Sequence, residues 1–408
     1  MARLVVTLPR GLGREEQHGF ARRAREAGAD LLELRSDLHG ERDVEPAALA
    51  GELPLLAAER GRPLPSTWLA TASERDRALG SPPDGRALIS WHAERPLEPR
   101  EALAAWEARA PDAAAVKHVE PLGSPAQALR LLETRRLLAE RFGAGVTVLA
   151  VGALALPFRC LLARENALDY VALDATALAA PGQRLLADAV RERKAKASSP
   201  LRRGILGTAI AQSRSPERHV QPFDRIDLPA DADLGPLLEA LHPFYAGFAV
   251  TSPFKKAAAQ IAGSSRPAVN TLRRTEGGWE GLNTDVDGAR AVLRSLGARS
   301  LTALGDGGVT AALREACAAE GVALSVLRRQ ALSDRSLSGT LVWTWPPQLP
   351  PPPRLRFDGA RVAVVTYGAR AQQVSDAIRA RGGEPVVVGE QWFSAQADGQ
   401  ARLWEVAP

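Results

Sequence analysis

Residues 247–256 read Gly-Phe-Ala-Val-Thr-Ser-Pro-Phe-Lys-Lys, residues 268–271 read Ala-Val-Asn-Thr, and residues 281–288 read Gly-Leu-Asn-Thr-Asp-Val-Asp-Gly. Each segment is a polar cluster at the end of an apolar run, where a strand is expected to pass into a loop. The clusters carry, in order, Lys255, Asn270, Asn283 and Asp285. Because loops on a rigid scaffold commonly hold catalytic and binding groups, the sequence predicts a site built from these three segments.

The length and composition predict a multidomain globular protein. The 408 residues exceed what one hydrophobic core usually serves, so two or three domains are expected. Hydrophobic residues make up 45% of the chain and charged residues 24%, which is ordinary for a globular protein. No apolar run approaches the length of a membrane span, and the run at residues 3–8 is too short for the core of a signal peptide. We therefore expect a cytoplasmic protein with no membrane partner.

The charge distribution favours small anionic substrates over nucleic acid. The net charge is +5 and the pI about 9.6, but arginines are spread along the chain and no nucleic-acid-binding motif accompanies them. Cys160 and Cys317 lie far apart, without a nearby Cys or His, so they are expected to be core residues. No metal site is expected. The sequence leaves the oligomeric state open.

The first half of the chain predicts a parallel α/β domain. Strand-like apolar runs alternate there with helix-like stretches, at 3–8, 31–34, 66–71, 87–91, 113–119, 146–152 and 168–173. The polar, proline-terminated segment 193–200 is expected to be a linker. A (β/α)8 barrel needs eight strands and carries its catalytic residues at their carboxyl ends, whereas seven runs are counted here.

Several polar residues follow these runs, namely Glu33, Arg35, His92, Lys117, Arg159 and Gln183. A lysine on one inward-facing strand and a histidine on its neighbour can act as a Schiff-base nucleophile with a general acid/base. Burial and nearby cations lower a lysine's pKa enough to leave a nucleophilic amine. Taken singly, each of these residues would instead be interpreted as a surface or core residue without function.

The set and its order resemble type I 3-dehydroquinate dehydratase over residues 1 to about 190. The resemblance implies that Lys117 forms an imine with the substrate ketone and that His92 moves the adjacent proton. Glu74 would orient His92. The remaining members of the set would bind substrate, with Arg159 and Gln183 holding the carboxylate and hydroxyls and Glu33 and Arg35 lining the pocket.

The first half also departs from that family. The arginine expected at the end of the third strand falls on Ala70, and the serine of Ser-Ala-Pro-Gly-Gln falls on Ala179. Only 17 residues separate Glu74 from His92, fewer than a helix and a strand with their loops need. We therefore expect a barrel that lacks one βα unit. The alternative is a degenerate barrel that serves as a binding or assembly module.

The three opening segments, in order and spacing, resemble the shikimate dehydrogenase family over residues 203–405. Lys255 and Asp285 are the expected acid/base pair, because hydride delivery to a carbonyl carbon requires a proton for the oxygen. The alternative for this pair is a structural ion pair. The resemblance implies that Ser213 and Ser215 bind the substrate carboxylate, and that Thr251, Asn270, Gln396 and Tyr367 contact the rest of the substrate. Ala249 replaces a family asparagine, which removes one substrate hydrogen bond.

A dinucleotide site is predicted at residues 301–313, where a strand, a glycine-rich turn and a helix start follow one another. The cofactor-binding residues expected there are Gly305, Gly307, Gly308 and Val309. The next strand runs into Arg328 and Arg329, with no acidic residue for a ribose, which favours the 2′-phosphate of NADP(H). Asp306 within the turn is unfavourable near phosphate.

The sequence thus predicts a fusion with a barrel at 1–195, a substrate-binding domain at 201–299 completed by about 386–408, and a Rossmann-like NADP-binding domain at 300–385. The two halves would catalyse consecutive steps, dehydration of 3-dehydroquinate and NADPH-dependent reduction of 3-dehydroshikimate to shikimate. The alternative is that only the dehydrogenase half is active. Activity on quinate and passage of product between the sites stay open.

Overall fold

The computed structural model describes residues 2–80, 87–195, 200–219, 221–332, 335–345 and 354–405. Its contacts divide the chain into two compact units. Unit 1 comprises Met1–Pro216 and Val220–Tyr245, and unit 2 comprises Glu217–His219 and Ala246–Pro408. Both are α/β structures, as expected. Among the described residues, none of the helices combines the length and the apolar character that a membrane crossing requires.

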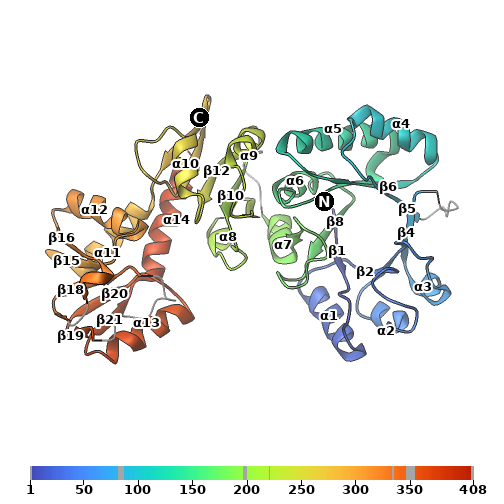
Figure 1. The fold of residues 1–408 in the computed structure, drawn as a ribbon. Helices are drawn as coiled ribbons and strands as arrows, with labels where there is room; N and C mark the ends of the chain where they lie inside the picture. The colour runs from blue at the N-terminus through green and yellow to red at the C-terminus, as the bar shows by residue number, and fades with distance from the viewer. Residues whose placement is uncertain are drawn as a thin grey trace. The chain divides into compact units, whose positions relative to one another are not determined.

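Unit 1 contains a large, mainly parallel sheet with helices between its strands (Figure 1). The strands are β1 (Arg3–Thr7), β2 (Leu31–Arg35), β3 (Leu55–Ala58), β4 (Glu74–Ala78), β5 (Ala87–His92), β6 (Ala115–Pro121), β7 (Val146–Val151), β8 (Leu168–Ala172) and β9 (Arg184–Leu185). The helices are α1 (Arg14–Glu26), α2 (Pro46–Ala50), α3 (Ser66–Thr71), α4 (Pro99–Arg109), α5 (Pro125–Phe142), η1 (Gly143–Gly145), α6 (Leu156–Leu162) and α7 (Leu186–Lys194). The strand order is β7-β6-β5-β4-β3-β2-β1-β8-β9.

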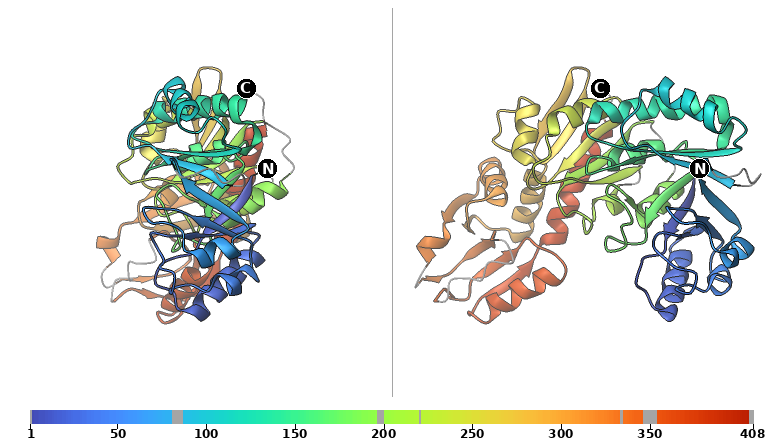
Figure 2. Two further views of the ribbon diagram at one scale, coloured as in Figure 1. Left: turned by 90° about the vertical axis from the view of Figure 1, so that its right-hand side faces the viewer. Right: turned by 45° about the vertical axis from the view of Figure 1, so that its right-hand side comes forward.

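The sheet curls around one apolar cluster. That cluster contains residues of seven strands, Val5, Leu31, Leu56, Leu88, Val119, Leu149, Leu168 and Tyr170. In a flat sheet, β1 and β8 would lie far from β5, β6 and β7, and their side chains could not share one cluster. The side-chain amide of Asn166 also links β7 to the start of β8, because it accepts from the Val148 N–H at 3.0 Å and donates to the Val148 carbonyl at 2.8 Å. Figures 1 and 2 show the helices outside this curled sheet.

Two sequence predictions for this sheet are wrong. Residues 66–71 form helix α3, which buries Trp68, and the third strand is instead the short apolar run 55–58. The second error is the missing strand, since β4 lies between β3 and β5 and completes eight parallel strands, β1 to β8. The connection from β4 to β5 comprises only residues 79–86. It is short, since a crossover between parallel strands usually needs a dozen residues or more.

Unit 1 also includes a parallel strand pair after α7. It consists of β10 (Arg202–Gly207) and β11 (Phe223–Asp227), accompanied by α8 (Ser215–Arg218) and α9 (Leu234–Leu241). Arg202 is fully buried and binds Asp224 through Nε at 2.5 Å, and Tyr245 donates to the same carboxylate at 2.7 Å. A buried guanidinium requires such a partner. The predicted linker lies partly outside the described residues, because 196–199 are not described.

Unit 2 contains antiparallel strands followed by a parallel sheet. The first group is β12 (Tyr245–Val250), β13 (Thr271–Thr275) and β14 (Gly278–Leu282), with α10 (Lys255–Ile261) and α11 (Asp285–Leu296). The second is β15 (Ser300–Leu304), α12 (Gly308–Glu320), β16 (Ala323–Leu327), η2 (Arg329–Leu332), β18 (Thr340–Trp343), β20 (Arg361–Val364), α13 (Ala369–Arg379) and β21 (Glu384–Val387). A small parallel pair joins β17 (Ser336–Leu337) to β19 (Arg356–Phe357), and α14 (Gly389–Glu405) ends the chain.

The parallel sheet has the order β16-β15-β18-β20-β21. From β15 the chain adds β16 on one side and then returns to add β18 on the other side, so the strand order reverses between β15 and β18. Ligands of such sheets bind in the crevice beside the carboxyl ends of the strands at this reversal. The predicted closing helix is α14, which packs closely on α11, since a Cβ at Gly288 would lie 2.8 Å from the Trp392 ring. The proline-rich residues 346–353 lie outside the described residues.

Candidate functional site

The three opening segments meet at one end of the antiparallel strands. Ala249 pairs with Thr271, and Thr271 pairs with Leu282, so the ends of β12 and β14 and the start of β13 lie at the same level. Helices α10 and α11 begin there, with Lys255 and Asp285 as their first residues. The Lys255 Nζ lies 2.8 Å from the Asp285 Oδ2. Asp285 at a helix N-terminus is also favoured by the helix dipole.

Asn270 lies beside this ion pair and has an unused donor. Its side chain is buried, and its Oδ1 accepts from the Thr284 N–H at 2.8 Å and from the Thr271 hydroxyl at 2.9 Å. Its Nδ2 is buried and has no hydrogen-bond partner among the described residues. Because buried polar groups are nearly always paired, this donor is suited to a ligand oxygen.

The other predicted substrate residues are placed as follows. Thr251 follows β12, and its carbonyl accepts from the Phe254 N–H. Tyr367 follows β20 and packs on Phe393 of α14, with 5.7 Å between ring centroids, and Gln396 lies one turn further along that helix, half-buried. In unit 1, the Ser213 hydroxyl accepts from the Ser215 N–H at 3.3 Å, as a residue at a helix start does.

The glycine-rich turn connects β15 to α12. Gly305 has φ of +125°, and a Cβ there would lie 2.6 Å from the Thr344 hydroxyl, so only glycine fits. At Gly307 and Gly308 a Cβ would meet nothing within 4 Å, so the backbone is open to a ligand. The first N–H groups of α12, those of Gly308 and Val309 among them, lack intrahelical partners and can donate to a phosphate.

Asp306 in this turn forms ion pairs with two arginines. Its Oδ2 lies 3.0 Å from the Arg328 Nη2 and its Oδ1 lies 3.1 Å from the Arg314 Nη2. These two hydrogen bonds lower the pKa of Asp306, which keeps it charged. Arg328, predicted to bind a phosphate, is thus held over the turn by a carboxylate. Arg329 begins the helical turn η2.

A second buried cluster lies on the inner face of the curled sheet, around Lys117. The Lys117 side chain is 3% exposed, and its Nζ lies 2.5 Å from the Asp76 Oδ2 and 3.1 Å from the Tyr170 hydroxyl. The Asp76 carboxylate also accepts from Arg60, at 2.5 Å, and from the Ser90 hydroxyl. Burial lowers the pKa of Lys117, and Asp76 opposes that effect. This environment is polar and charged, and little of the Lys117 and Asp76 side chains is exposed.

His92 ends β5 on the same face. The desolvation of its inner side and the positive charges of Lys117 and Arg60 lower its pKa, although the residue is exposed to solvent. The imidazole is therefore neutral at neutral pH, and the same positive charges make it a weaker base.

Of the two residues predicted to line the pocket, Glu33 lies on the inner face, where it is buried and accepts from the Thr7 hydroxyl at 2.6 Å. The Arg35 guanidinium pairs with Asp37 at 2.7 Å. The charge of Glu33 acts on Lys117 and that of Arg35 on His92, so all four predicted residues lie in one region.

The structure does not bring Glu74 to His92, which corrects the sequence prediction. Glu74 begins β4 and binds Arg3, with its Oε2 at 2.8 Å from the Arg3 Nη2. Because Ala78 pairs with Ser90, Glu74 lies six residues below His92 along the strands, roughly 20 Å at the usual rise. Asp76, two residues later in the same strand, is the carboxylate beside Lys117.

Arg159 and Gln183 each have a partner other than Lys117. Arg159 is buried in α6, where its Nη2 donates to the Tyr170 carbonyl at 2.6 Å, and Asp169 and Arg184 act on its charge. Asp169 and Tyr170 point to opposite faces of β8, so Arg159 belongs to the outer layer. The Gln183 Oε1 accepts from the Ala179 N–H at 2.8 Å.

The sequence analysis missed Asp76, Arg60 and Tyr170. Arg60 comes two residues after β3 and is thus the arginine at the end of the third strand, which was wrongly assigned to Ala70. The run Leu-Pro-Leu-Leu-Ala-Ala before it was a detectable signal. Asp76 lies in a strand of charged residues whose pattern gave no apolar alternation, and only its partners identify it.

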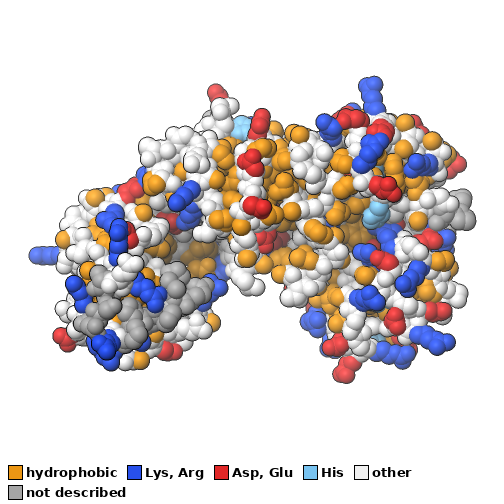
Figure 3. Space-filling view, viewed as in Figure 1, with side chains coloured by type: hydrophobic (Ala, Val, Ile, Leu, Met, Phe, Trp, Pro, Cys, Tyr) orange, Lys and Arg blue, Asp and Glu red, His pale blue; other side chains and the backbone are white. Residues whose placement is uncertain are grey.

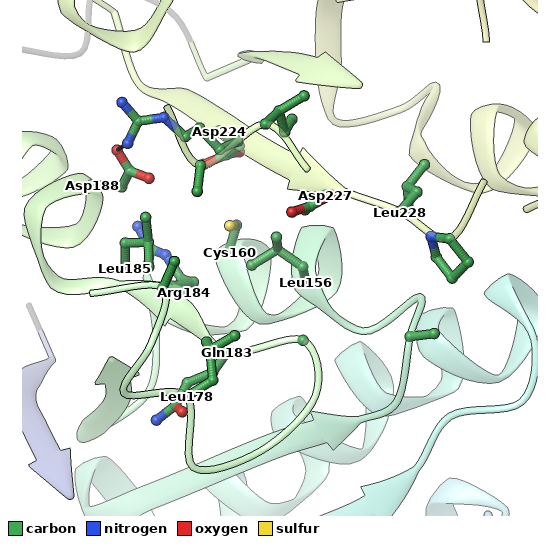
Figure 4. Close-up of a pocket in the computed structure, with 17 residues that line it drawn as sticks. Leu156, Cys160, Leu178, Gln183, Arg184, Leu185, Asp188, Asp224, Asp227 and Leu228 are labelled. Carbon is green, nitrogen blue, oxygen red and sulfur yellow. Dashed lines mark hydrogen bonds and ion pairs between the residues drawn. The ribbon is translucent and has the colours of Figure 1, made fainter. Parts of the chain in front are cut away.

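Unit 1 contains a mainly apolar cavity of about 330 Å³ between α6, the β8–β9 connection and β11 (Figure 4). Leu156 and Cys160 of α6, Leu178 and Gln183 line it (Figure 4). Burial raises the pKa of the Cys160 thiol, and the thiol of Cys317 is buried as well, as expected for core cysteines. On the face of the molecule shown in Figure 3, Lys and Arg side chains are interspersed with Asp and Glu.

Comparison with known proteins relates the C-terminal half to one enzyme family. No family model matches the chain. A shikimate dehydrogenase (NADP(+)) of Anaeromyxobacter sp. (strain K) is 37% identical over 145 residues, which are 31% of this chain and 52% of that protein. One of Microcystis aeruginosa is 36% identical over 137 residues, 29% of this chain and 48% of that protein. The chain thus spans about half the length of the curated relatives it matches.

Two solved structures are also similar. The dehydroquinate dehydratase and shikimate dehydrogenase from S. pombe AroM is 18% identical with a TM-score of 0.40, over 99% of this chain and 96% of that one. The Thermus thermophilus shikimate 5-dehydrogenase, in complex with NADP(H) and shikimate, is 23% identical with a TM-score of 0.42, over 51% of this chain and 95% of that one. By sequence, then, the C-terminal half of this chain is similar to shikimate dehydrogenases.

Proposed function

We propose that this chain reduces 3-dehydroshikimate to shikimate with NADPH. The observation that carries the proposal is the Lys255–Asp285 pair at 2.8 Å, next to the buried and unpaired Nδ2 of Asn270. Identity of 37% to shikimate dehydrogenases over 145 residues supports it. A purely structural ion pair would not explain an adjacent buried donor without a partner.

In this reaction Lys255 and Asp285 supply the proton that the carbonyl oxygen takes up as it becomes a hydroxyl. The Lys255 ammonium donates, and the Asp285 carboxylate at 2.8 Å holds it in place. Asn270 donates from Nδ2 to a ring hydroxyl of the substrate. The Thr251 hydroxyl forms a hydrogen bond with the neighbouring ring hydroxyl. Gln396 and Tyr367 complete the part of the substrate site that lies in unit 2.

NADPH supplies the hydride when bound. The residues of the turn fit a dinucleotide, because Gly305 has the positive φ and close approach that exclude a side chain, and Gly307 and Gly308 leave open backbone. The α12 N-terminus would hold the pyrophosphate, and Arg328 and Arg329 would hold the 2′-phosphate.

The test is NADPH oxidation with 3-dehydroshikimate, followed by absorbance and by chromatography of the product. Wild type should form shikimate, and Lys255→Ala should not, while both bind NADPH equally. Equal rates in wild type and Lys255→Ala would reject the proposed roles.

We infer a second activity in unit 1, dehydration of 3-dehydroquinate through a Schiff base on Lys117. Eight parallel strands that curl around one cluster support a (β/α)8-type barrel with a shortened β4–β5 connection. Buried Lys117 with neutral His92 on the same face supports the chemistry. His92 would accept the proton next to the imine, and Arg60 and Glu33 lie near enough to bind substrate groups.

The alternative is a barrel that serves only as a binding or assembly module beside an active dehydrogenase. It draws support from Arg159, which is buried in α6 and donates to the Tyr170 carbonyl instead of facing Lys117. Sodium borohydride with 3-dehydroquinate distinguishes the two, since reduction of an imine adds the mass of the adduct to wild type and nothing to Lys117→Ala. No adduct on wild type, with intact reduction of 3-dehydroshikimate, would establish the module. We retain the domain boundaries 1–195, 201–299 and 300–385 as part of the proposal.

A further inference from the structure

Asp76 is the carboxylate that forms the ion pair with Lys117, and it has three further polar neighbours. It is fully buried in the middle of β4, and its Oδ2 binds both the Lys117 Nζ and the Arg60 Nη2 at 2.5 Å. Its Oδ1 accepts from the Ser90 hydroxyl, and the Tyr170 hydroxyl lies 3.5 Å from Oδ2. These donors come from four different segments, which fix the carboxylate in one position.

The titratable groups around Lys117 come from five different segments of the sheet. They are Glu33 of β2, Arg60 after β3, Asp76 of β4, His92 of β5 and Tyr170 of β8. Together with Lys117, Arg60 gives two cations, which balance the carboxylates of Glu33 and Asp76. Buried ion pairs contribute little net stability compared with apolar side chains of the same size, because desolvation offsets their attraction. The cluster is therefore expected to have a role other than stability.

We propose that Asp76 is the positioning residue and the permanent counter-charge of Lys117, holding Nζ in place as an ammonium and later as the iminium of the Schiff base. This inference rests on the function proposed for unit 1. Asp76 is not assigned contact with the reacting carbon, and it acts through Lys117.

The chemistry explains why a fixed negative charge is useful here. Once Nζ has lost a proton, its lone pair attacks the ketone carbon, a C–N bond forms, and the C=O π bond breaks. The carbonyl oxygen takes up two protons in all and leaves as water, and a C=N double bond forms. Overall, ammonium plus ketone gives iminium plus water, so the nitrogen is positive before and after. A carboxylate at 2.5 Å stabilises both states without moving.

Asp76 is a poor candidate for the base in this step. Burial alone would raise its pKa, but the charges of Lys117 and Arg60 and their hydrogen bonds lower it well below the usual range. The carboxylate therefore stays ionised at neutral pH. His92 ends β5 on the same face and has a neutral ring nitrogen, so it is the proton acceptor proposed here.

The experiment uses the full chain and the variant Asp76→Asn, which keeps the shape and removes the charge. Competitive labelling with acetic anhydride, read by mass spectrometry, gives the pH at which half of Lys117 is reactive. We expect this midpoint to fall by about 1 to 3 units, the usual effect of one adjacent opposite charge. With 3-dehydroquinate and borohydride, the adduct at neutral pH should fall by about tenfold or more, because the iminium loses its counter-charge.

Two control variants separate charge from general damage. Asp76→Glu retains the charge and should keep the midpoint close to wild type. Asp169→Asn removes another buried carboxylate, which pairs with Arg184 at 3.0 Å on the outer face of β8, and should leave the Lys117 midpoint unchanged. If Asp76→Asn does not fold, Asp76→Ser carries the same expectation.

An unshifted midpoint in the folded neutral variant overturns the counter-charge inference, whatever the adduct shows. A shift of the same size in Asp169→Asn also overturns it, since the effect would then be structural. Absence of any adduct on wild type, together with a shifted midpoint, rejects the Schiff-base function and leaves Asp76 as the counter-charge of the lysine alone.

Discussion

Asp306→Asn should strengthen binding of NADP(H) to the glycine-rich turn. The carboxylate lies 3.0 Å from the Arg328 Nη2 and 3.2 Å from its Nε, so it occupies the guanidinium proposed to bind the 2′-phosphate. It also places a negative charge in the turn itself. Asparagine keeps the size of the side chain and removes the charge, which frees Arg328 for a phosphate.

The size of the expected gain in affinity depends on how exposed the Asp306–Arg328 ion pair is. The Arg328 side chain is 76% exposed and that of Asp306 is 32% exposed, so water and salt screen the pair. Exposed ion pairs change an equilibrium by a small factor, and we expect about two- to fivefold tighter binding. The gain should shrink as ionic strength rises, because the screening length is only about 10 Å at 0.1 M salt.

Isothermal titration calorimetry with 2′,5′-ADP and with 5′-AMP separates the two effects of Asp306. The variant should gain affinity for 2′,5′-ADP and less for 5′-AMP, and Arg328→Ala should lose affinity for 2′,5′-ADP alone. Asp376→Asn removes a comparably exposed ion pair, with Arg379 at 2.9 Å, and should change neither.

Weaker or unchanged binding of 2′,5′-ADP by Asp306→Asn would refute this reasoning. An equal gain for both nucleotides would also refute it, because the charge would then act on the phosphate that both share. If wild type binds neither nucleotide, the cofactor proposal itself fails.

Asp285→Asn should lower kcat for 3-dehydroshikimate by about 10² to 10⁴ with NADPH affinity unchanged, and loss of NADPH affinity instead would contradict its role in proton transfer. Glu74→Gln should leave the borohydride adduct at the wild-type level, because the structure places this residue roughly 20 Å from the chemistry. Asp224→Ala should destabilise unit 1 by about 1–3 kcal/mol in urea unfolding, since the buried Arg202 guanidinium then keeps only Glu192 as a partner and the Tyr245 hydroxyl loses its acceptor. Burial would raise the pKa of Glu192, but its two arginine partners lower it below the unfolded value, so this carboxylate contributes stability in full above about pH 4.5. That contribution should disappear as pH falls, and a urea midpoint constant from pH 6 to pH 3 would contradict it.

The sequence alone located the Lys255–Asp285 site. Its three polar clusters each follow or begin an element, and the antiparallel pairing of β13 with both β12 and β14 brings these ends together. The glycine-rich turn could also be predicted from the sequence, because a backbone with positive φ favours glycine and a helix start favours particular residue types. Both predictions rest on interactions within a few residues or across one strand pair.

The third strand of the first half could not be predicted from local sequence. Residues 55–58 and 66–71 are both short apolar runs, and periodicity over four to six residues does not separate a buried strand from a buried helix. Packing decided the matter, since Trp68 is buried only when 66–71 is helical and covers the sheet. The same error displaced Arg60 and created the apparent loss of a strand.

The partners of the charged residues were decided by tertiary structure alone. In β4, Glu74 and Asp76 share one face, and only the stagger of β4 against β5 and β6 places Asp76 beside Lys117, 41 residues away, and Glu74 beside Arg3. Asp306 and Arg328 likewise meet because β15 and β16 are parallel neighbours that end at the same level. Local sequence determines which residues end a strand or begin a helix, through periodicity and turn chemistry. Strand order and register determine which charges face each other, and a charge's chemistry depends on that partner.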